Sequence, residues 1–422
     1  MINISRIAAI GARKAWLWGR RHGHGHGDGL SLDRPRLLVD VSAIIRHDAQ
    51  TGIQRVVRAV WSELRRRNGE GFLLQPVFAT MRRGYCNAPA SFLEGAKPDR
   101  ASEPVKIRPG DKFLGLDLSA HLLPHYRSQI RAWKMHGATI HLLVYDLLPL
   151  QRPEWFSASA VSNYRKWYNV LVNDADQAIC ISDAVAKELR LRLANTSHSK
   201  PSVVRMQLGA DIEASIPSTG VSPKVSDVLG RLRGRSAILM VGTIEPRKGY
   251  DVALQAFDWL WRTRPRDAPD LVIVGKPGWK TSELQARLCA YGEGNARLHW
   301  LTAVSDEGLC RLYETCTGVF IASHAEGFGL PLAEAALFRR HVLARDLLVF
   351  REQRLPNVSY FDDDSPPALG RRLMDLARAG ETRTAPMAEL ATWSDSVDDL
   401  MREIRIGIGH RTEVDLQFRK AS

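Results

Sequence analysis

The chain has 422 residues and a formal net charge of +13 at neutral pH. This length exceeds what one ordinary hydrophobic core supports, so two domains are expected. The five cysteines are scattered and form no CxxC pair, which disfavours a disulfide framework or a structural zinc site and favours a reducing cytoplasm. No apolar run reaches the roughly eighteen residues of a membrane-spanning helix. The charge is compatible with nucleic acid, anionic lipid or a phosphorylated substrate.

Residues 1–35 stand apart as a basic leader. Apolar residues such as Ile4 and Leu17 recur at roughly helical spacing among arginines and lysines. This pattern predicts a surface-bound amphipathic helix, and a leader without a role is the alternative. Arg13 and Lys14 interrupt the apolar region and disfavour a secretory signal. The HGHGHGDG tract that follows favours a flexible linker over a metal site.

Strand and helix patterns then alternate in two blocks, residues 36–216 and 237–395. Residues 217–236 are rich in Ser, Pro, Gly and basic residues and are expected to be a linker, and 396–422 to be a helical tail. The expected strands are 37–41, 73–78, 113–116, 140–145, 177–181, 203–208, 237–241, 271–274, 297–300, 319–322 and 341–344. Such alternation predicts an α/β fold with parallel sheets, whose ligands bind beyond the carboxyl ends of the strands.

Residues 324–334 (HAEGFGLPLAE) join an expected strand to an alanine-rich helical pattern. Pro331 predicts the start of that helix. Three amides are then free: those of Phe328, Gly329 and Leu330. Free amides at a helix N-terminus attract anions, and Gly327 and Gly329 let a ligand approach the backbone closely. The stretch therefore predicts a seat for a diphosphate.

Two glutamates flank this predicted seat, Glu326 on the turn and Glu334 in the first helical turn. A carboxylate repels phosphate, so we expect each to accept hydrogen bonds from hydroxyl groups, of a sugar on one side and of a ribose on the other. The alternative is that both merely complement the helix dipole. A second turn, residues 241–249 (VGTIEPRKG), supplies Arg247 and Lys248, which would offset the charge of a leaving nucleoside diphosphate.

Together these two motifs resemble the retaining glycosyltransferases of family four, which have the GT-B fold of two facing Rossmann-like domains. The family's pair of glutamates separated by seven residues matches Glu326 and Glu334, and its Arg-Lys pair matches Arg247 and Lys248. The resemblance implies that Glu326 contacts the donor sugar, Glu334 the ribose hydroxyls, and the two cations the diphosphate.

Three further residues are assigned through the same resemblance. Asp146 follows an apolar strand, at the family's position for a polar residue near the transferred sugar and the acceptor. Gly52 matches a small-residue turn facing the donor, and an ordinary helix start is the alternative that Gly52 alone does not exclude. Gly242 lies on the turn that carries the basic pair. The chain departs from the family at Arg339 and His341, where relatives usually have Gly and Pro, which puts that turn in doubt.

The acidic triplet 362–364 is expected to cap a helix rather than to bind a metal. Transfer of the sugar from its nucleotide donor is expected to need no divalent ion. The chain is thus expected to be a cytoplasmic retaining hexosyltransferase, with the inner face of the cytoplasmic membrane as a second expected location. The resemblance is strongest to bacterial O-antigen mannosyl and rhamnosyl transferases, and implies GDP-mannose as donor and a glycan or lipid-linked glycan as acceptor, without nucleic acid. The alternatives are a nucleotide-sugar epimerase or hydrolase on the same fold, or a non-catalytic basic adaptor at a membrane.

Overall fold

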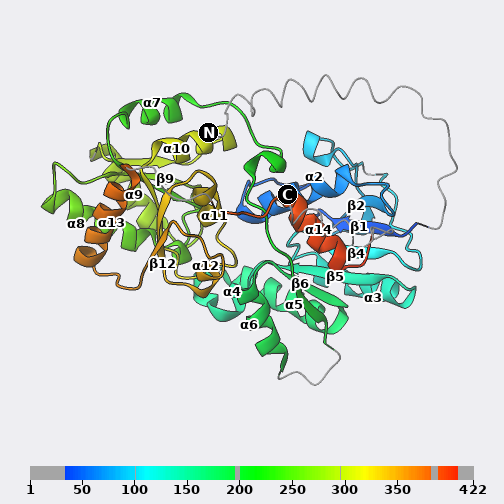
Figure 1. The fold of residues 1–422 in the computed structure, drawn as a ribbon. Helices are drawn as coiled ribbons and strands as arrows, with labels where there is room; N and C mark the ends of the chain where they lie inside the picture. The colour runs from blue at the N-terminus through cyan, green and yellow to red at the C-terminus, as the bar shows by residue number, and fades with distance from the viewer. Residues whose placement is uncertain (1–33, 100, 195–199, 295, 382–387, 407–422) are drawn as a thin grey trace, which may run out of the picture.

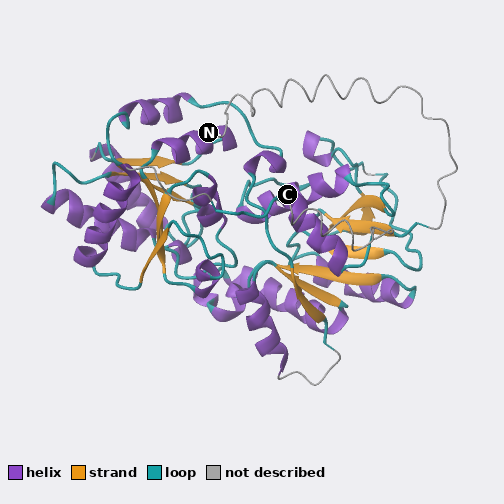
Figure 2. Ribbon diagram, viewed as in Figure 1, coloured by secondary structure: helices purple, strands orange, loops and turns teal. Residues whose placement is uncertain are grey.

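The computed structural model describes residues 34–99, 101–194, 200–294, 296–381 and 388–406. The expected leader helix and the last residues of the expected tail lie outside this part of the chain. Two α/β domains face each other, each with helices on both sides of a twisted sheet (Figures 1 and 2). Among the described residues, no helix has both the length and the apolar character needed to cross a membrane.

The N-terminal domain is built on a seven-stranded sheet with the order β3-β2-β1-β4-β5-β6-β7, parallel except for β3. Its strands are β1 (Arg36–Asp40), β2 (Leu73–Thr80), β3 (Arg83–Asn87), β4 (Lys112–Gly115), β5 (Thr139–Val144), β6 (Gln177–Cys180) and β7 (Ser202–Arg205). The six expected strands are present. The edge strand β3 is additional, because its sequence RGYCN lacks a sustained apolar pattern.

Side chains of alternate residues in this sheet enter two different cores. Val39, Leu114 and Leu143 pack with α2 (Gly52–Arg66) on one face. Their neighbours Leu38, Phe113 and Leu142 pack on the other face, with helices α3 (Arg127–Met135), α5 (Ala158–Asp174) and α6 (Asp183–Ala194). This period of two is that of strands buried on both sides. A short helix, α4 (Leu148–Gln151), follows β5.

Helix α2 begins with a complete capping motif in its sequence. Thr51 caps it, and Gln54 completes a capping box by binding back to the amide of Thr51. Its apolar face is buried: Val56, Val57, Val60, Trp61 and Leu64. The first turn of α2 is thereby fixed at the carboxyl edge of the sheet, facing the second domain.

The C-terminal domain contains a six-stranded parallel sheet with the order β10-β9-β8-β11-β12-β13. Its strands are β8 (Ala237–Val241), β9 (Asp270–Val274), β10 (Leu298–Leu301), β11 (Gly318–Ile321), β12 (His341–Arg345) and β13 (Val358–Phe361). Its helices are α8 (Tyr250–Thr263), α9 (Ser282–Gly294), α10 (Asp306–Thr315), α11 (Leu330–Leu337), α12 (Leu348–Arg351) and α13 (Pro366–Glu381). The five expected strands are present, and β13 is additional.

The expected linker, 217–236, is partly a helix. Helix α7 (Pro223–Arg231) is capped by Ser222, and its Val225 and Val228 are buried in the core of the C-terminal domain. Two apolar residues three apart form too short a stripe to stand out in a Ser- and Pro-rich sequence. The segment free of regular structure is therefore shorter than expected.

The chain returns to the N-terminal domain at its described end. Helix α14 (Trp393–Glu403) packs against α2 (Figure 1). It buries Trp393, Val397 and Leu400 in the core that α2 forms with the N-terminal sheet. Gly209 makes this crossing possible, because a Cβ there would lie 2.3 Å from the Trp393 amide nitrogen. The N-terminal domain is consequently made of two separate parts of the sequence.

Candidate functional site

Glu326 lies at the centre of an ion cluster between the two turns that the sequence singles out. Arg247 Nη1 donates to Glu326 Oε2, and Lys248 Nζ donates to Glu326 Oε1, both at 2.6 Å. Ser323 Oγ also donates to Oε1, at 2.7 Å, and Arg247 Nε binds the Glu245 carboxylate at 2.9 Å. The structure thus brings the basic pair and Glu326 together as one unit, and adds Ser323 and Glu245, which the sequence reasoning missed.

The two cations determine the charge state of Glu326. Its side chain is 8% exposed, and burial alone would raise its pKa. The charges of Arg247 and Lys248 outweigh burial and lower the pKa of Glu326 to about 2. Glu326 is therefore an ionised hydrogen-bond acceptor throughout the physiological pH range, and it has no proton to donate.

Asp146 lies beside this cluster, two residues after the end of β5. Its Oδ1 accepts a hydrogen bond from the Leu148 amide at 3.1 Å. Burial raises the pKa of Asp146, against the opposing charge of Arg247. The position at the carboxyl end of a buried parallel strand is the one the sequence predicts. Asp146 is the contribution of the N-terminal domain to a cluster that is otherwise built by the C-terminal domain.

The helix after the Glu326 turn starts one residue earlier than predicted. Helix α11 begins at Leu330, with Gly329 as its N-cap and Pro331 second. Within the described chain, the three predicted amides of Phe328, Gly329 and Leu330 donate to no acceptor. Gln353 Nε2 fixes the turn by donating to the Phe328 carbonyl at 2.7 Å. Because of the earlier start, Glu334 lies in the second helical turn rather than the first.

The two glycines of this turn are also required by packing within the protein. A Cβ on Gly327 would lie 1.9 Å from the carbonyl oxygen of Tyr145, so Gly327 lets the two domains touch. Gly329 adopts a φ of +91°, and a Cβ there would meet the Phe350 ring at 2.4 Å. The close approach of a ligand to these two glycines stays a prediction, and the free amides lie beside them.

The other two predicted glycines lie on the flanking turns. A Cβ on Gly242 would lie 3.2 Å from Lys248 Cε, so Gly242 makes room for the lysine stem. Gly52, the first residue of α2, faces α11, since a Cβ there would lie 3.7 Å from Leu330 Cδ1. The start of α2 therefore lies against the start of α11 across the domain boundary.

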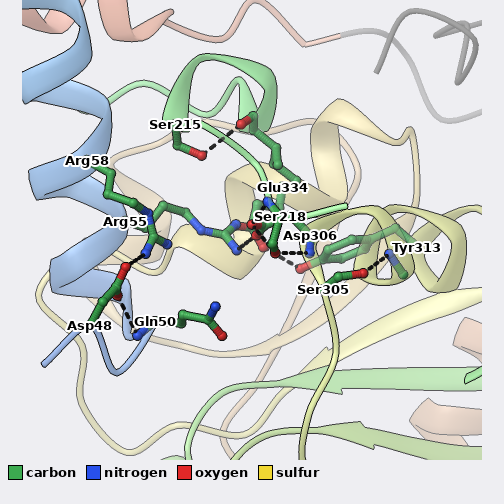
Figure 3. A network of polar contacts seen from close by, with 12 residues as sticks. Asp48, Gln50, Arg55, Arg58, Ser215, Ser218, Ser305, Asp306, Tyr313 and Glu334 are labelled. Atoms are coloured by element: carbon green, nitrogen blue, oxygen red, sulfur yellow. Dashed lines mark hydrogen bonds and ion pairs between the residues drawn. The ribbon is translucent and has the colours of Figure 1, made fainter. Parts of the chain in front are cut away.

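Glu334 belongs to a second cluster, distinct from that of Glu326 (Figure 3). Arg55 of α2 donates to Glu334 Oε1, and Tyr313 Oη donates to Glu334 Oε2 at 2.8 Å. The same guanidinium reaches Asp306, with Nη2 2.6 Å from Oδ1. Sequence reasoning missed all three partners. Arg55 lies only three residues after Gly52, so the motif that drew attention to Gly52 contained the signal.

The departures at Arg339 and His341 leave the local turn formed. Arg339 takes a φ of +54°, the left-handed conformation in which glycine would be unstrained, and its amide donates to the Ala336 carbonyl. His341 is the first residue of β12. In the acidic triplet, Asp363 accepts from the Ser365 amide and Asp364 pairs with Arg345. The described residues contain no group of three or more His, Cys, Asp or Glu side chains placed to hold a metal ion.

Similarity to known proteins is consistent with this geometry. Residues 223–387, which contain Arg247, Lys248, Glu326 and Glu334, match the family model for glycosyl transferases group 1. This part of the chain is therefore similar to the group 1 glycosyl transferases. A solved structure of Anabaena HepE, in complex with UDP and glucose, aligns with a TM-score of 0.55 over 92% of this chain and 100% of that one, at 15% identity. The fold is accordingly GT-B.

Sequence similarity extends beyond the group 1 domain. Serotype-specific mannosyltransferase WbdA of Escherichia coli is 36% identical over 382 residues, which are 88% of this chain and 45% of that protein. O-antigen chain mannosyltransferase B of Escherichia coli is 27% identical over 236 residues, which are 52% of this chain and 60% of that protein. The chain thus spans about half the length of the WbdA relatives that it matches.

Proposed function

We propose that the chain is a retaining mannosyltransferase, which moves mannose from a nucleoside diphosphate donor to a hydroxyl group of a glycan in bacterial O-antigen synthesis. The observation that carries the proposal is the Glu326 carboxylate, held ionised by Arg247 and Lys248 beside the free amides of the α11 N-terminus. Cations and helix amides stabilise a leaving diphosphate, and a fixed carboxylate accepts hydrogen bonds from sugar hydroxyls.

The geometry supports a reaction in which positioning and charge stabilisation lower the barrier. Arg247 and Lys248 would share their positive charge between Glu326 and the departing phosphate oxygens, so no divalent ion is required for that task. Asp146, on the facing domain, would accept a hydrogen bond from the sugar or the acceptor hydroxyl.

Retention at the anomeric carbon follows from the resemblance to family four. The environment of Glu326 supports it without a covalent intermediate. Both oxygens of Glu326 are engaged by donors, and a pKa of about 2 makes the carboxylate a weak nucleophile. We propose that the acceptor attacks on the face from which the diphosphate leaves, and that the leaving phosphate takes the acceptor proton.

The choice of donor rests on similarity to WbdA and to O-antigen chain mannosyltransferase B, which favours GDP-mannose. The acceptor would be a glycan, carried by a lipid at the inner face of the cytoplasmic membrane. The formal charge of +13 supports peripheral contact with anionic lipid. Co-sedimentation with anionic vesicles at low and high salt would test that contact, and salt-insensitive binding would contradict an electrostatic origin.

The proposed function is tested by incubating the chain with GDP-mannose, UDP-glucose and other nucleotide sugars, each with and without a mannose oligosaccharide and with EDTA throughout. We expect an acceptor-dependent mannosylated product from GDP-mannose, with α-configuration by NMR. Glu326→Gln should abolish it. Donor turnover without an acceptor would favour the epimerase or hydrolase alternative. Absence of any donor binding would favour the non-catalytic adaptor.

A further inference from the structure

The guanidinium of Arg55 joins the two domains at the predicted ribose site. It belongs to the first turn of α2 in the N-terminal domain, and its two terminal nitrogens bind different carboxylates of the C-terminal domain, Glu334 on α11 and Asp306 on α10 (Figure 3). The Arg55 side chain is 15% exposed, that of Glu334 4%, and that of Asp306 11%. Three charges are thus largely removed from solvent at one point of the domain boundary.

The two carboxylates are also fixed from their other sides. Tyr313 Oη holds the second oxygen of Glu334 at 2.8 Å. The amide and hydroxyl of Ser218 both donate to the second oxygen of Asp306, each at 2.9 Å. Ser218 lies in the segment that connects the domains, just before α7. Arg55 therefore completes a continuous network from α2, through α10 and α11, to the interdomain connection.

An arginine suits this position better than a lysine. Its planar fork presents two N–H groups to two acceptors at once, whereas an ammonium group is a point charge. Without the guanidinium, two carboxylates would remain close together in a buried setting with no cation between them. Removing one member of a buried ion network usually costs far more than removing an exposed ion pair.

The network lies beside the predicted diphosphate seat. Gly52 at the start of α2 approaches Leu330 at the start of α11, so two helix N-termini converge there. Both ends carry partial positive charge and repel each other, whereas an anion between them attracts both. The ion pairs of Arg55 hold the two ends together, which places the first turn of α2 within reach of a bound diphosphate.

We propose that Arg55 is a positioning residue of the donor site. It orients Glu334 for the ribose hydroxyls and sets the α2 N-terminus against the diphosphate seat. A carboxylate has about four lone-pair positions. Arg55 and Tyr313 each occupy one, on different oxygens, which leaves one on each oxygen for the two neighbouring ribose hydroxyls. The inference rests on the proposed function, since that assigns Glu334 to the ribose.

The test compares the binding of GDP and UDP, by isothermal titration, to the wild-type chain and to Arg55→Ala and Arg55→Lys. Arg58→Ala is the matched control, because Arg58 lies one turn further along α2 and pairs with Asp48 inside the N-terminal domain, at 2.6 Å (Figure 3). We expect Arg55→Ala to weaken the preferred nucleotide at least about tenfold, and Arg58→Ala to change it less than about twofold. Arg55→Lys keeps the positive charge and is the variant less prone to misfold. Its nucleotide affinity should lie between those of Arg55→Ala and Arg58→Ala.

Two further measurements separate positioning from general stability. In a Glu334→Gln background, Arg55→Ala should cost less nucleotide affinity than it does in the wild type, because part of its effect acts through Glu334. In the wild-type background it should raise the donor KM much more than it lowers kcat. Hydrogen exchange of residues 217–222 should accelerate in Arg55→Ala and remain unchanged in Arg58→Ala, because Ser218 loses the Arg55 end of its network.

If the wild-type chain binds a nucleotide measurably and Arg55→Ala binds it equally well or more tightly, the inference is overturned and the proposed function stays intact. Fully additive losses in the Glu334→Gln background would overturn it as well. If the wild-type chain binds neither nucleoside diphosphate nor nucleotide sugar, the proposed function fails and the inference fails with it. The two failures are therefore distinguishable from the wild-type titration alone.

Discussion

Glu326 shows how the charge state of one residue follows from its neighbours. A carboxylate with 8% exposure would ordinarily hold a proton more tightly than in water, yet two cations and a hydroxyl reverse the effect and lower its pKa to about 2. The same contacts fix its orientation. The role proposed for Glu326 requires both the negative charge and the fixed orientation. A carboxyl group that rotated or took up a proton would no longer accept hydrogen bonds from sugar hydroxyls in one defined direction.

The depressed pKa of Glu326 predicts a pH-dependent stability. A folded-state pKa of about 2 against an ordinary value of 4.5 contributes about 3 kcal/mol to folding. This contribution is complete above about pH 5 and is lost as pH falls from 4.5 towards 2. Urea unfolding of wild type and Glu326→Gln should therefore differ most at neutral pH and converge in acid. A constant difference from pH 7 to pH 3 would contradict the ion cluster.

Lys248 offers a prediction for activity. Its ammonium binds Glu326, which precedes the free amides in the same turn, so Lys248→Ala should raise the barrier to transfer by about 2 to 4 kcal/mol at saturating donor. Product formation in single-turnover experiments measures this directly. Lys224→Ala is the control, since Lys224 is an exposed residue on α7. Near-normal turnover of Lys248→Ala would remove the 241–249 turn from the chemistry.

At the level of elements, the two domains meet where the Glu326 turn touches the end of β5. Gly327 is required there, because a Cβ would lie 1.9 Å from the Tyr145 carbonyl oxygen and 3.2 Å from Asp146 Cβ. Other contacts lie further along the boundary. Trp279 Nε1 and Lys280 Nζ donate to the carbonyls of Trp155 and Glu154, both at 2.8 Å. The Glu326 turn is thus placed by contacts from both domains.

Gly327→Ala should push the Glu326 turn away from the end of β5. We expect a loss of about 1 to 3 kcal/mol in unfolding free energy from overpacking, and a fall in activity of about a hundredfold if the turn shifts by about 1 Å. Calorimetry and a transfer assay provide the two readouts. Gly292→Ala is the control, because it lies within helix α9 with open space around its Cβ and should be neutral or slightly stabilising. Full activity of Gly327→Ala would show that the contact with Tyr145 is dispensable.

Elements with strong local patterns were predictable from the sequence, and those that depend on distant partners were not. Buried parallel strands such as β8 are continuous apolar runs, and Thr51 with Gln54 is a complete capping signal. The edge strand β3 is formed by pairing with β2, which its own sequence does not encode. Helix α7 is stabilised mainly by the core it packs against.

The same distinction applies to the candidate site. Glu326, Arg247 and Lys248 lie on turns after buried strands, so parallel-sheet geometry places them at one edge and their proximity could be expected. The partnership of Arg55 with Glu334 and Asp306 joins residues far apart in the sequence and on different domains. Their meeting depends on how the two sheets are oriented relative to each other, which no local pattern specifies.

For the whole molecule, α14 is a structural part of the N-terminal domain although it follows the C-terminal domain in sequence. Trp393 is 1% exposed and packs in the core formed by α2 and the first sheet. Trp393→Ala should therefore cost about 3 to 5 kcal/mol and lower the stability of the N-terminal domain selectively. Hydrogen exchange would locate the effect: α2 should lose protection and α8 should keep it. Equal loss in both domains would contradict this assignment.

The return of α14 also has a consequence for the order of folding during synthesis. The residues of the first sheet leave the ribosome first, yet the part of the apolar core that α14 covers stays exposed until residues 393–403 have been made. The C-terminal domain lies between them and is complete by about residue 381. The domain that is translated second can therefore finish folding first. Until α14 has been made, the N-terminal domain keeps an exposed apolar surface. It is therefore the part of the nascent chain most in need of chaperone protection.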